Sequence, residues 1–243
     1  MVHKDLEFLL VAENCDLRIL TDYLTMRNNG NIRLTQKFPH SLVNSDAYRN
    51  FYPEKLTCMT NNIVNEFRMY GGNTFVNIFR GTGPEYSTIL MDVCKKLKVN
   101  FNKNSPVEII ELNLLQKILV NSLENMTIEQ LSEFASECGI PVQNYTKQAI
   151  IASIQVLIKK GGFTSYKIAV IVANSIAKAL LGRGLTFAAN AGLTKWLSIF
   201  AGPIGWTATA IWTAVDIAGP AYRVTIPAVI QIAYMRAKNK KID

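Results

Sequence analysis

The stretch 196–215, WLSIFAGPIGWTATAIWTAV, decides the fold class, because it runs for twenty residues without a charged side chain. By length alone it reaches the threshold for one transmembrane helix. Pro203 stands near its middle, however, and a proline inside a helix removes a hydrogen bond and clashes with the preceding turn. Two helices of about 15 residues, each about 22 Å long, fall short of the ~30 Å hydrocarbon core. The sequence therefore predicts a helical hairpin rather than a single span.

A hairpin that is apolar on nearly all sides has to be covered, either by the protein's own helices or by lipid. Its many alanine and glycine residues permit close helix packing in both settings. Tryptophan marks the interface in a membrane and fills the core in a soluble protein. The residues that we expect to form this membrane or core hairpin are Trp196, Phe200, Pro203, Trp206, Ile211 and Trp212.

Charge is divided unequally along the chain, whose formal net charge is +8. Residues 1–145 carry 14 Lys and Arg against 16 Asp and Glu, whereas residues 146–243 carry 12 against two. A segment that is both basic and apolar is typical of binding to anionic lipid, and the alternative is a solvated rim around core helices. Nucleic acid is a less favoured partner, because basic residues here accompany apolar rather than polar surface. The lysines predicted to face lipid are Lys159, Lys160, Lys167 and Lys178.

Two isolated charges, Asp216 and Arg223, flank the Gly219-Pro220 pair in this apolar region. They are placed to pair across the turn, and a buried pair of this kind pins a structure more than it stabilises it. We predict a structural charge pair, with a proton or ion relay in a membrane as the alternative.

The rest of the chain has the spacing and the breaks of a helical protein. Ser105 with Glu108, and Thr127 with Gln130, have the pattern of capping boxes at two helix starts. The predicted helices span 3–26, 53–70, 85–98, 105–123, 127–139, 146–160, 165–181, 184–200, 204–218 and 221–238. The fold class is therefore all-α, a multi-helix bundle with a hydrophobic C-terminal hairpin. We expect an acidic N-terminal helical region at 1–145, with a small module at 1–35, and a basic, hydrophobic bundle at 146–243.

Residues that support catalysis or cofactor binding are sparse. The four cysteines form no CxxC pair and the only histidines are His3 and His40, so we expect neither a zinc site nor a disulfide framework. No nucleotide-binding or hydrolase pattern is present. We therefore expect no catalytic, cofactor-binding or metal residues and a non-enzymatic protein. The first ten residues do not form a signal peptide, which favours the cytoplasm, with the inner face of the plasma membrane as a peripheral site.

Several stretches resemble the YaaW-like family of bacterial proteins. They are 5–9, 70–75, 79–81, 92–94, 98–105, 169–194 (AVIVANSIAKALLGRGLTFAANAGLT), 200–206 (FAGPIGW) and 216–234 (DIAGPAYRVTIPAVIQIAY). The resemblance covers nearly the whole chain. Members of the family are sometimes labelled as similar to ubiquinol–cytochrome c chaperones, which implies a soluble assembly factor, and the resemblance implies no catalytic residues.

Two functions are consistent with these patterns. The first is a membrane-associating protein whose 184–218 hairpin enters or docks on lipid, with pore formation or a stress-related role as extensions. The second is a soluble, chaperone-like or partner-binding protein in which the same hairpin is buried core. The expected partners are accordingly anionic membrane lipid or another protein.

Overall fold

The computed structural model describes residues 4–25, 41–72, 77, 81–141, 146–159, 165–185, 197, 199–200, 202–204 and 222–242. Within these ranges the protein is all-helical, as predicted, and contains no strand. Its helices are η1 (Lys4–Val11), α1 (Asn14–Thr25), η3 (Leu42–Asn44), α2 (Asp46–Phe51), η4 (Leu56–Met59), α3 (Thr60–Met69), α5 (Tyr86–Lys96), α6 (Val107–Leu123), α7 (Ile128–Glu137), α8 (Lys147–Lys159), α9 (Ser165–Leu181) and α11 (Tyr222–Ile242).

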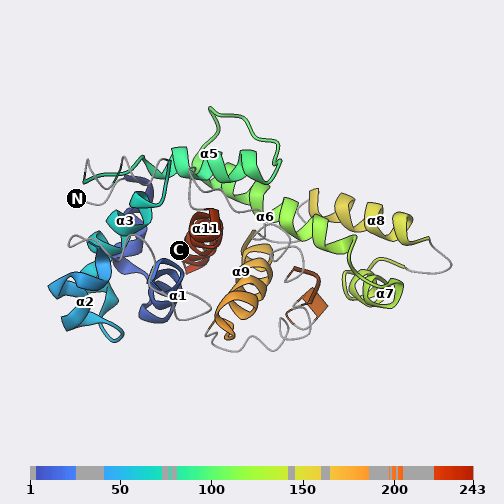
Figure 1. Cartoon of the computed structure of the whole chain (residues 1–243). Coiled ribbons are helices and arrows are strands. Elements are labelled where there is room, and N and C mark those ends of the chain that lie inside the picture. The colour runs from blue at the N-terminus through green and yellow to red at the C-terminus, as the bar shows by residue number, and fades with distance from the viewer. Residues whose placement is uncertain are drawn as a thin grey trace.

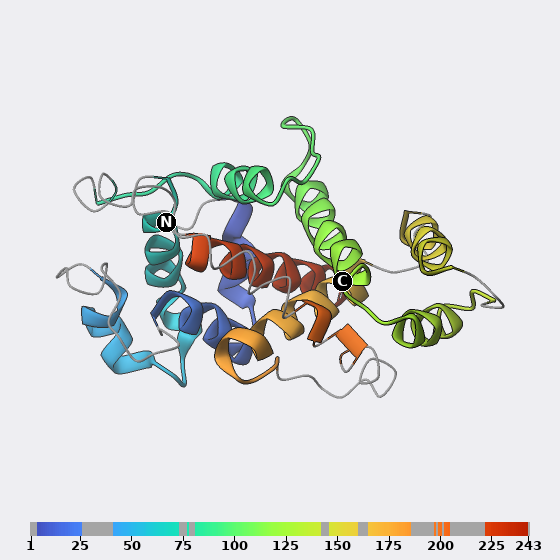
Figure 2. The ribbon, with the colours of Figure 1, turned by 45° about the vertical axis from the view of Figure 1, so that its right-hand side comes forward.

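Helix α11 lies at the centre of the molecule, and the chain's own helices cover it on several sides (Figures 1 and 2). It packs against α9, α1, α5, α6 and η1. Every residue from 224 to 236 is buried, so the helix has no solvent face along this stretch. A helix that is buried all round is typical of the core of a protein. The C-terminal apolar sequence therefore supplies the centre around which the N-terminal helices assemble.

Helix α9 is the second core helix, since every residue from 168 to 177 is buried. It lies beside α11 and also contacts α6 and α1. Its end is closed locally: Gly182 adopts a positive φ of 68°, and its N–H donates to the carbonyl of Lys178 at 3.1 Å. Asn174 then accepts a hydrogen bond from the backbone N–H of Leu185 at 3.0 Å, which turns the chain back onto the helix. Glycine is favoured at such a left-handed position after a helix.

Two predicted helices begin or continue differently in the structure. The single helix expected over 3–26 is divided into η1 and α1, because Asn14 is bound to another segment: its amide donates to the Pro53 carbonyl and accepts from the Leu56 N–H. The helix expected from residue 53 starts instead with a turn and η4, and α3 begins at Thr60.

The two predicted capping boxes have opposite outcomes. Thr127 and Gln130 form a complete box at the start of α7, with both reciprocal hydrogen bonds present. The box predicted for Ser105 is wrong, because extended backbone at Pro106 makes that residue the N-cap of α6, and it has no side-chain bond. The Ser105 N–H instead donates to the Asn102 carbonyl, in the turn before the helix.

No helix among the described residues is long and apolar enough to cross a membrane. The predicted hairpin over 184–218 is described at 184–185, 197, 199–200 and 202–204, and the last three of these groups are helical. Within them Ile199, Phe200, Pro203 and Ile204 are buried. The Phe200 ring packs edge-on against Phe134 of α7, with 4.8 Å between ring centroids, so this part of the stretch is covered by protein.

Candidate functional site

The C-terminal part of the chain is joined to the N-terminal part by ion pairs. Four of its cations, three of them on α11, lie within 4 Å of acids from the first half of the chain. The pairs are Arg183 with Asp22, Arg236 with Glu111, Lys238 with Glu13 and Asp16, and Lys240 with Glu108. Part of the charge asymmetry along the sequence is thus an asymmetry between partners in one fold.

Arg236 is the best enclosed of these cations. Its Nε donates to both oxygens of Glu111 at 3.1 and 2.9 Å, and its guanidinium also donates to the Asp5 carbonyl at 2.6 Å. The guanidinium carbon lies 4.4 Å from the ring centroid of Phe8, and the Tyr86 hydroxyl donates to Glu111 at 2.5 Å. One side chain thereby links η1, α5 and α6 to α11. Burial raises the pKa of the Glu111 carboxyl, and Arg236 opposes that rise.

Lys238 neutralises a second acidic group at the start of α1. Its ammonium lies 2.7 Å from Glu13 and 2.8 Å from the buried carboxylate of Asp16. Hydrogen bonding from Lys238 lowers the pKa of Glu13, whereas burial raises the pKa of Asp16. Cys15 adds a sulfur, and the three groups have ligand atoms within 4.8 Å of one another, which is metal-ligand spacing. The Lys238 ammonium already supplies positive charge to both carboxylates, so this cluster is best understood as an ion-pair network.

Cys94 and Arg183 also have structural rather than chemical roles. None of the four cysteines forms a disulfide. Cys94 is buried, and burial raises the pKa of its thiol to about 12, so the reactive thiolate is suppressed. Arg183 pairs with Asp22, which also accepts a hydrogen bond from the Tyr52 hydroxyl at 2.9 Å.

The lysines that were predicted to face lipid are solvent-accessible where the structure describes them. Lys159, Lys167 and Lys178 are exposed, and Lys160 lies outside the described residues. For the predicted charge pair, Arg223 is exposed near the start of α11, and Asp216 lies outside the described residues. The pairing of these two charges therefore stays a prediction.

Two of the six predicted hairpin residues are described by the structure, and four are not. Phe200 and Pro203 are buried. The remaining four predicted hairpin residues lie outside the described residues: Trp196, Trp206, Ile211 and Trp212.

Helices α7 and α8 form the candidate functional surface. They pack on each other and lie together at the end of the molecule away from α2 (Figures 1 and 2). Two of the large hydrophobic side chains that the described chain exposes are here, Ile128 at 45% and Val156 at 50%. Exposed apolar side chains on a projecting helix pair make it a candidate interaction site.

Helix α8 has two clearly different faces. Its inner face carries Ile150, Ile154 and Ile158, which are buried and spaced four residues apart. Gln148, Ala152, Val156 and Lys159 lie on the opposite side, and all four are exposed. The spacing of 3.6 residues per turn brings each set onto one stripe of the helix. The inner stripe holds α8 to the molecule and the outer stripe is free for contact.

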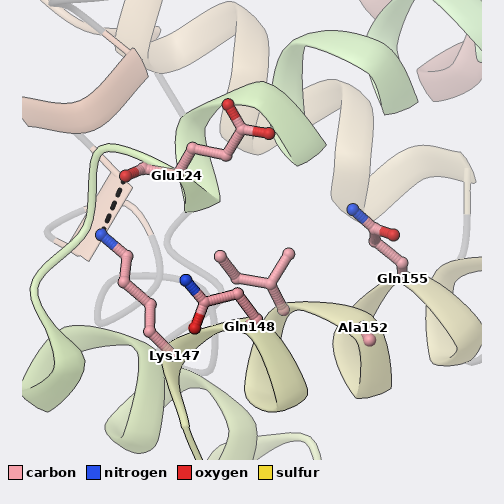
Figure 3. A pocket seen from close by; sticks show the side chains of 6 residues that line it. Glu124, Lys147, Gln148, Ala152 and Gln155 are labelled. Atoms are coloured by element: carbon pink, nitrogen blue, oxygen red, sulfur yellow. Dashed lines mark hydrogen bonds between the residues drawn. The ribbon is translucent and has the colours of Figure 1, made fainter.

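A surface hollow lies between α8 and the end of α6 (Figure 3). Its lining residues are Glu124, Lys147, Gln148, Ile151, Ala152 and Gln155. The Lys147 ammonium donates to the Glu124 carbonyl at 2.9 Å, which joins α8 to the last turn of α6. Lined by amides, one cation, one acid and small apolar groups, the hollow suits a polar peptide segment better than a reaction centre.

Sequence reasoning missed the buried ion pairs. Glu111 is the partner of Arg236 and is almost fully buried. The one available signal was the position of Arg236 inside an otherwise apolar helical stripe, where an unpaired cation would be costly.

Together these features define a class: an all-α protein whose apolar C-terminal helices are its core and whose α7–α8 pair projects.

No family model matches the chain, and no solved structure matches it. The chain does match curated relatives. A UPF0174 protein of Helicobacter pylori strain J99 is 45% identical over 99% of this chain and 93% of the relative. Another, from H. pylori strain 26695, is 41% identical over 82% of this chain and 97% of the relative. The YaaW protein of Escherichia coli K12 is 30% identical over 96% of this chain and 93% of its own length. The chain belongs to the UPF0174 family.

Proposed function

We propose that this protein is a non-enzymatic, partner-binding protein of the cytoplasm, and that the α7–α8 helix pair is the surface that contacts the partner. The observation that carries the proposal is the outer stripe of α8, which exposes Val156 beside a polar hollow at one end of the molecule. A small apolar contact next to directional polar groups is the usual composition of a protein interface.

The burial of α9 and α11, the helices on either side of the predicted 184–218 hairpin, supports a partner-binding function over insertion of these two helices into lipid. Helices α9 and α11 already have their apolar surfaces covered by the protein itself. Releasing α11 from the core means breaking the Arg236 and Lys238 ion pairs, which leaves Glu111 and Asp16 buried without their cations. Such a step is strongly unfavourable.

Site-specific photo-crosslinking in cells of the native host tests the proposal. A photoreactive phenylalanine analogue replaces Val156 on α8, and the matched control carries it at Val11, which is 75% exposed on η1. We expect discrete crosslinked adducts from position 156 and none from position 11. Equal labelling from both positions, or none from position 156, contradicts the proposal.

Association with anionic membranes is a second candidate, and one observation favours it. Lys159, Lys167 and Lys178 are exposed and belong to the basic part of the chain. Lysines near a bilayer surface each add about 1 kcal/mol of attraction to anionic lipid. Co-sedimentation with phosphatidylglycerol vesicles tests this candidate: binding that is lost when the three lysines are changed to glutamate supports it, and no binding by the unchanged protein removes it.

A further inference from the structure

Helix α7 carries charges of one sign only. Its sequence IEQLSEFASE contains Glu129, Glu133 and Glu137 and no basic residue. Glu129 and Glu133 are exposed and four residues apart, so they lie on one face, and Ile128 is exposed at the first helical position. The outer surface of α7 is therefore acidic with an apolar edge.

Helix α8 carries the opposite sign. Its sequence KQAIIASIQVLIK contains Lys147 and Lys159 and no acidic residue. Lys159 ends the exposed stripe that includes Val156. Lys147 is half-buried and donates to the Glu124 carbonyl, so the exposed cation of α8 is Lys159. Because α7 and α8 pack side by side, the pair presents an acidic face next to this cation, and each helix has one exposed large hydrophobic side chain.

This arrangement limits the kind of partner. A uniformly acidic partner would match α8 and be repelled by α7, and a uniformly basic partner would do the reverse. A matching surface must carry both signs in a similar arrangement. A second copy of this chain, related by a two-fold axis, does so: α7 of each copy meets α8 of the other, and the contact is made twice.

We propose that the α7–α8 pair is a self-association surface and that the protein forms a two-fold symmetric dimer through it. The inference rests on the proposed function, because it names the partner of the same surface. The two contacts of Glu129 with the basic helix of the other copy, and the burial of Val156 and Ile128 between copies, hold the dimer together.

Charge reversal in two complementary variants tests the dimer. The α7 variant is Glu129→Lys with Ser136→Lys, which leaves Glu133 in place, and the α8 variant is Gln148→Glu with Lys159→Glu. All four changed side chains are exposed, and circular dichroism with thermal unfolding verifies that each variant keeps the fold. Light scattering after size exclusion, from about 1 to about 100 µM, measures the dissociation constant of each protein.

The unchanged protein should dimerise in this range, and each variant alone should bind itself at least about tenfold more weakly. An equimolar mixture should recover the dimer. At one contact the two substituted helices then carry opposite added charges, and at the other the unchanged α8 of one variant meets the unchanged α7 of the other. Native mass spectrometry identifies that species as one copy of each variant. A monomeric unchanged protein, a mixture that stays monomeric, or variants that dimerise normally would each overturn the inference. A monomeric protein that still crosslinks from position 156 to a different protein overturns the dimer and leaves the proposed function standing.

Discussion

Helices α11 and α8 are both basic and both rich in Ile, Val and Ala, yet they have opposite places in the molecule. Helix α11 is buried from residue 224 to residue 236, and its cations Arg236, Lys238 and Lys240 all pair with acids from other helices. Helix α8 buries only a stripe of isoleucines, and Lys159 is exposed. Basic residues next to apolar sequence therefore have two different environments here: those of α11 form ion pairs within the protein, and Lys159 of α8 lies on the surface.

The difference follows from where the partner acids are. The partner acids of α11 lie on two helices that contact it, α1 and α6. Asp16 is in α1 and Glu13 directly precedes it, and α6 carries Glu108 and Glu111. Helix α8 contacts α7 and α6, and its one described polar contact to α6 is with a backbone carbonyl, that of Glu124. Three cations of α11 thus pair with specific carboxylates, whereas in α8 Lys147 donates to a backbone carbonyl and Lys159 is exposed.

The largest expected effect comes from removing the central cation of α11. Arg236→Met should lower the free energy of unfolding by about 3–5 kcal/mol, because Glu111 is then left buried without its guanidinium partner. Urea denaturation at pH 7 measures the loss as a shift in midpoint at constant slope. The double variant Glu111→Leu with Arg236→Met should recover much of it, since no buried charge remains. A loss below about 1 kcal/mol in the single variant contradicts the importance of this pair.

A smaller, pH-dependent effect is expected at the next cation of α11. Lys238→Met should cost about 2–3 kcal/mol at pH 7, because the Asp16 carboxylate stays buried without an ammonium. Burial raises the pKa of Asp16 in the folded state, so the folded protein takes up a proton before the unfolded chain does. The variant therefore gains stability relative to the unchanged protein as pH falls from 7 towards the ordinary Asp pKa of about 3.9.

Two controls accompany that measurement. Lys240→Met removes a mostly exposed pair with Glu108 and should cost at most about 0.5 kcal/mol at any pH. Asp16→Asn with Lys238→Met should show a smaller pH trend, because Asp16 no longer titrates and only Glu13, whose pKa Lys238 lowers, still responds to the loss of the lysine. A deficit in Lys238→Met that grows as pH falls would show that Asp16 does not control it.

A matched pair of valines compares the two helices directly. Val229 in α11 is fully buried, and Val156 in α8 is 50% exposed. Val229→Ala should lower the free energy of unfolding by about 2 kcal/mol, because it removes buried methyl groups and leaves a cavity. Val156→Ala should change it by less than about 0.5 kcal/mol while weakening self-association. Similar losses of stability at both positions would mean that α8 does not have the exposed stripe that distinguishes it from the buried α11.

Features that depend on local chemistry could be predicted from the sequence. The starts of α7 and α8 follow from Thr127 with Gln130 and from Thr146, whose hydroxyl accepts the Ala149 N–H. Helix α9 was predicted over 165–181, and the structure has it at Ser165–Leu181. These signals lie within a few residues of one another, so periodicity and capping were sufficient.

Features that depend on distant residues could not be predicted. Arg236 contacts the Asp5 carbonyl across 231 residues of sequence and Glu111 across 125. Nothing in a single sequence connects such positions. The sequence alone therefore indicates lipid as a partner of the basic C-terminal part, whereas the structure shows acids around α11. The candidate surface could not be predicted for the complementary reason: α8 has an ordinary amphipathic pattern, and only the packing shows that Gln148, Ala152 and Val156 are exposed.

A local effect, confined to one helix start, separates the stability of the α7–α8 pair from that of the core. Thr127→Ala removes the capping box of α7 and should cost about 1 kcal/mol, because an N–H at the helix start loses its acceptor. Ser45→Ala is the matched control, since the Ser45 hydroxyl accepts from the Tyr48 N–H at the start of α2. Hydrogen exchange should show faster exchange at α7 amides only in the first variant, with α11 amides unchanged in both. If α11 amides accelerate together with α7, the two regions unfold as one cooperative unit, and the projecting pair is an extension of the core rather than a separable surface.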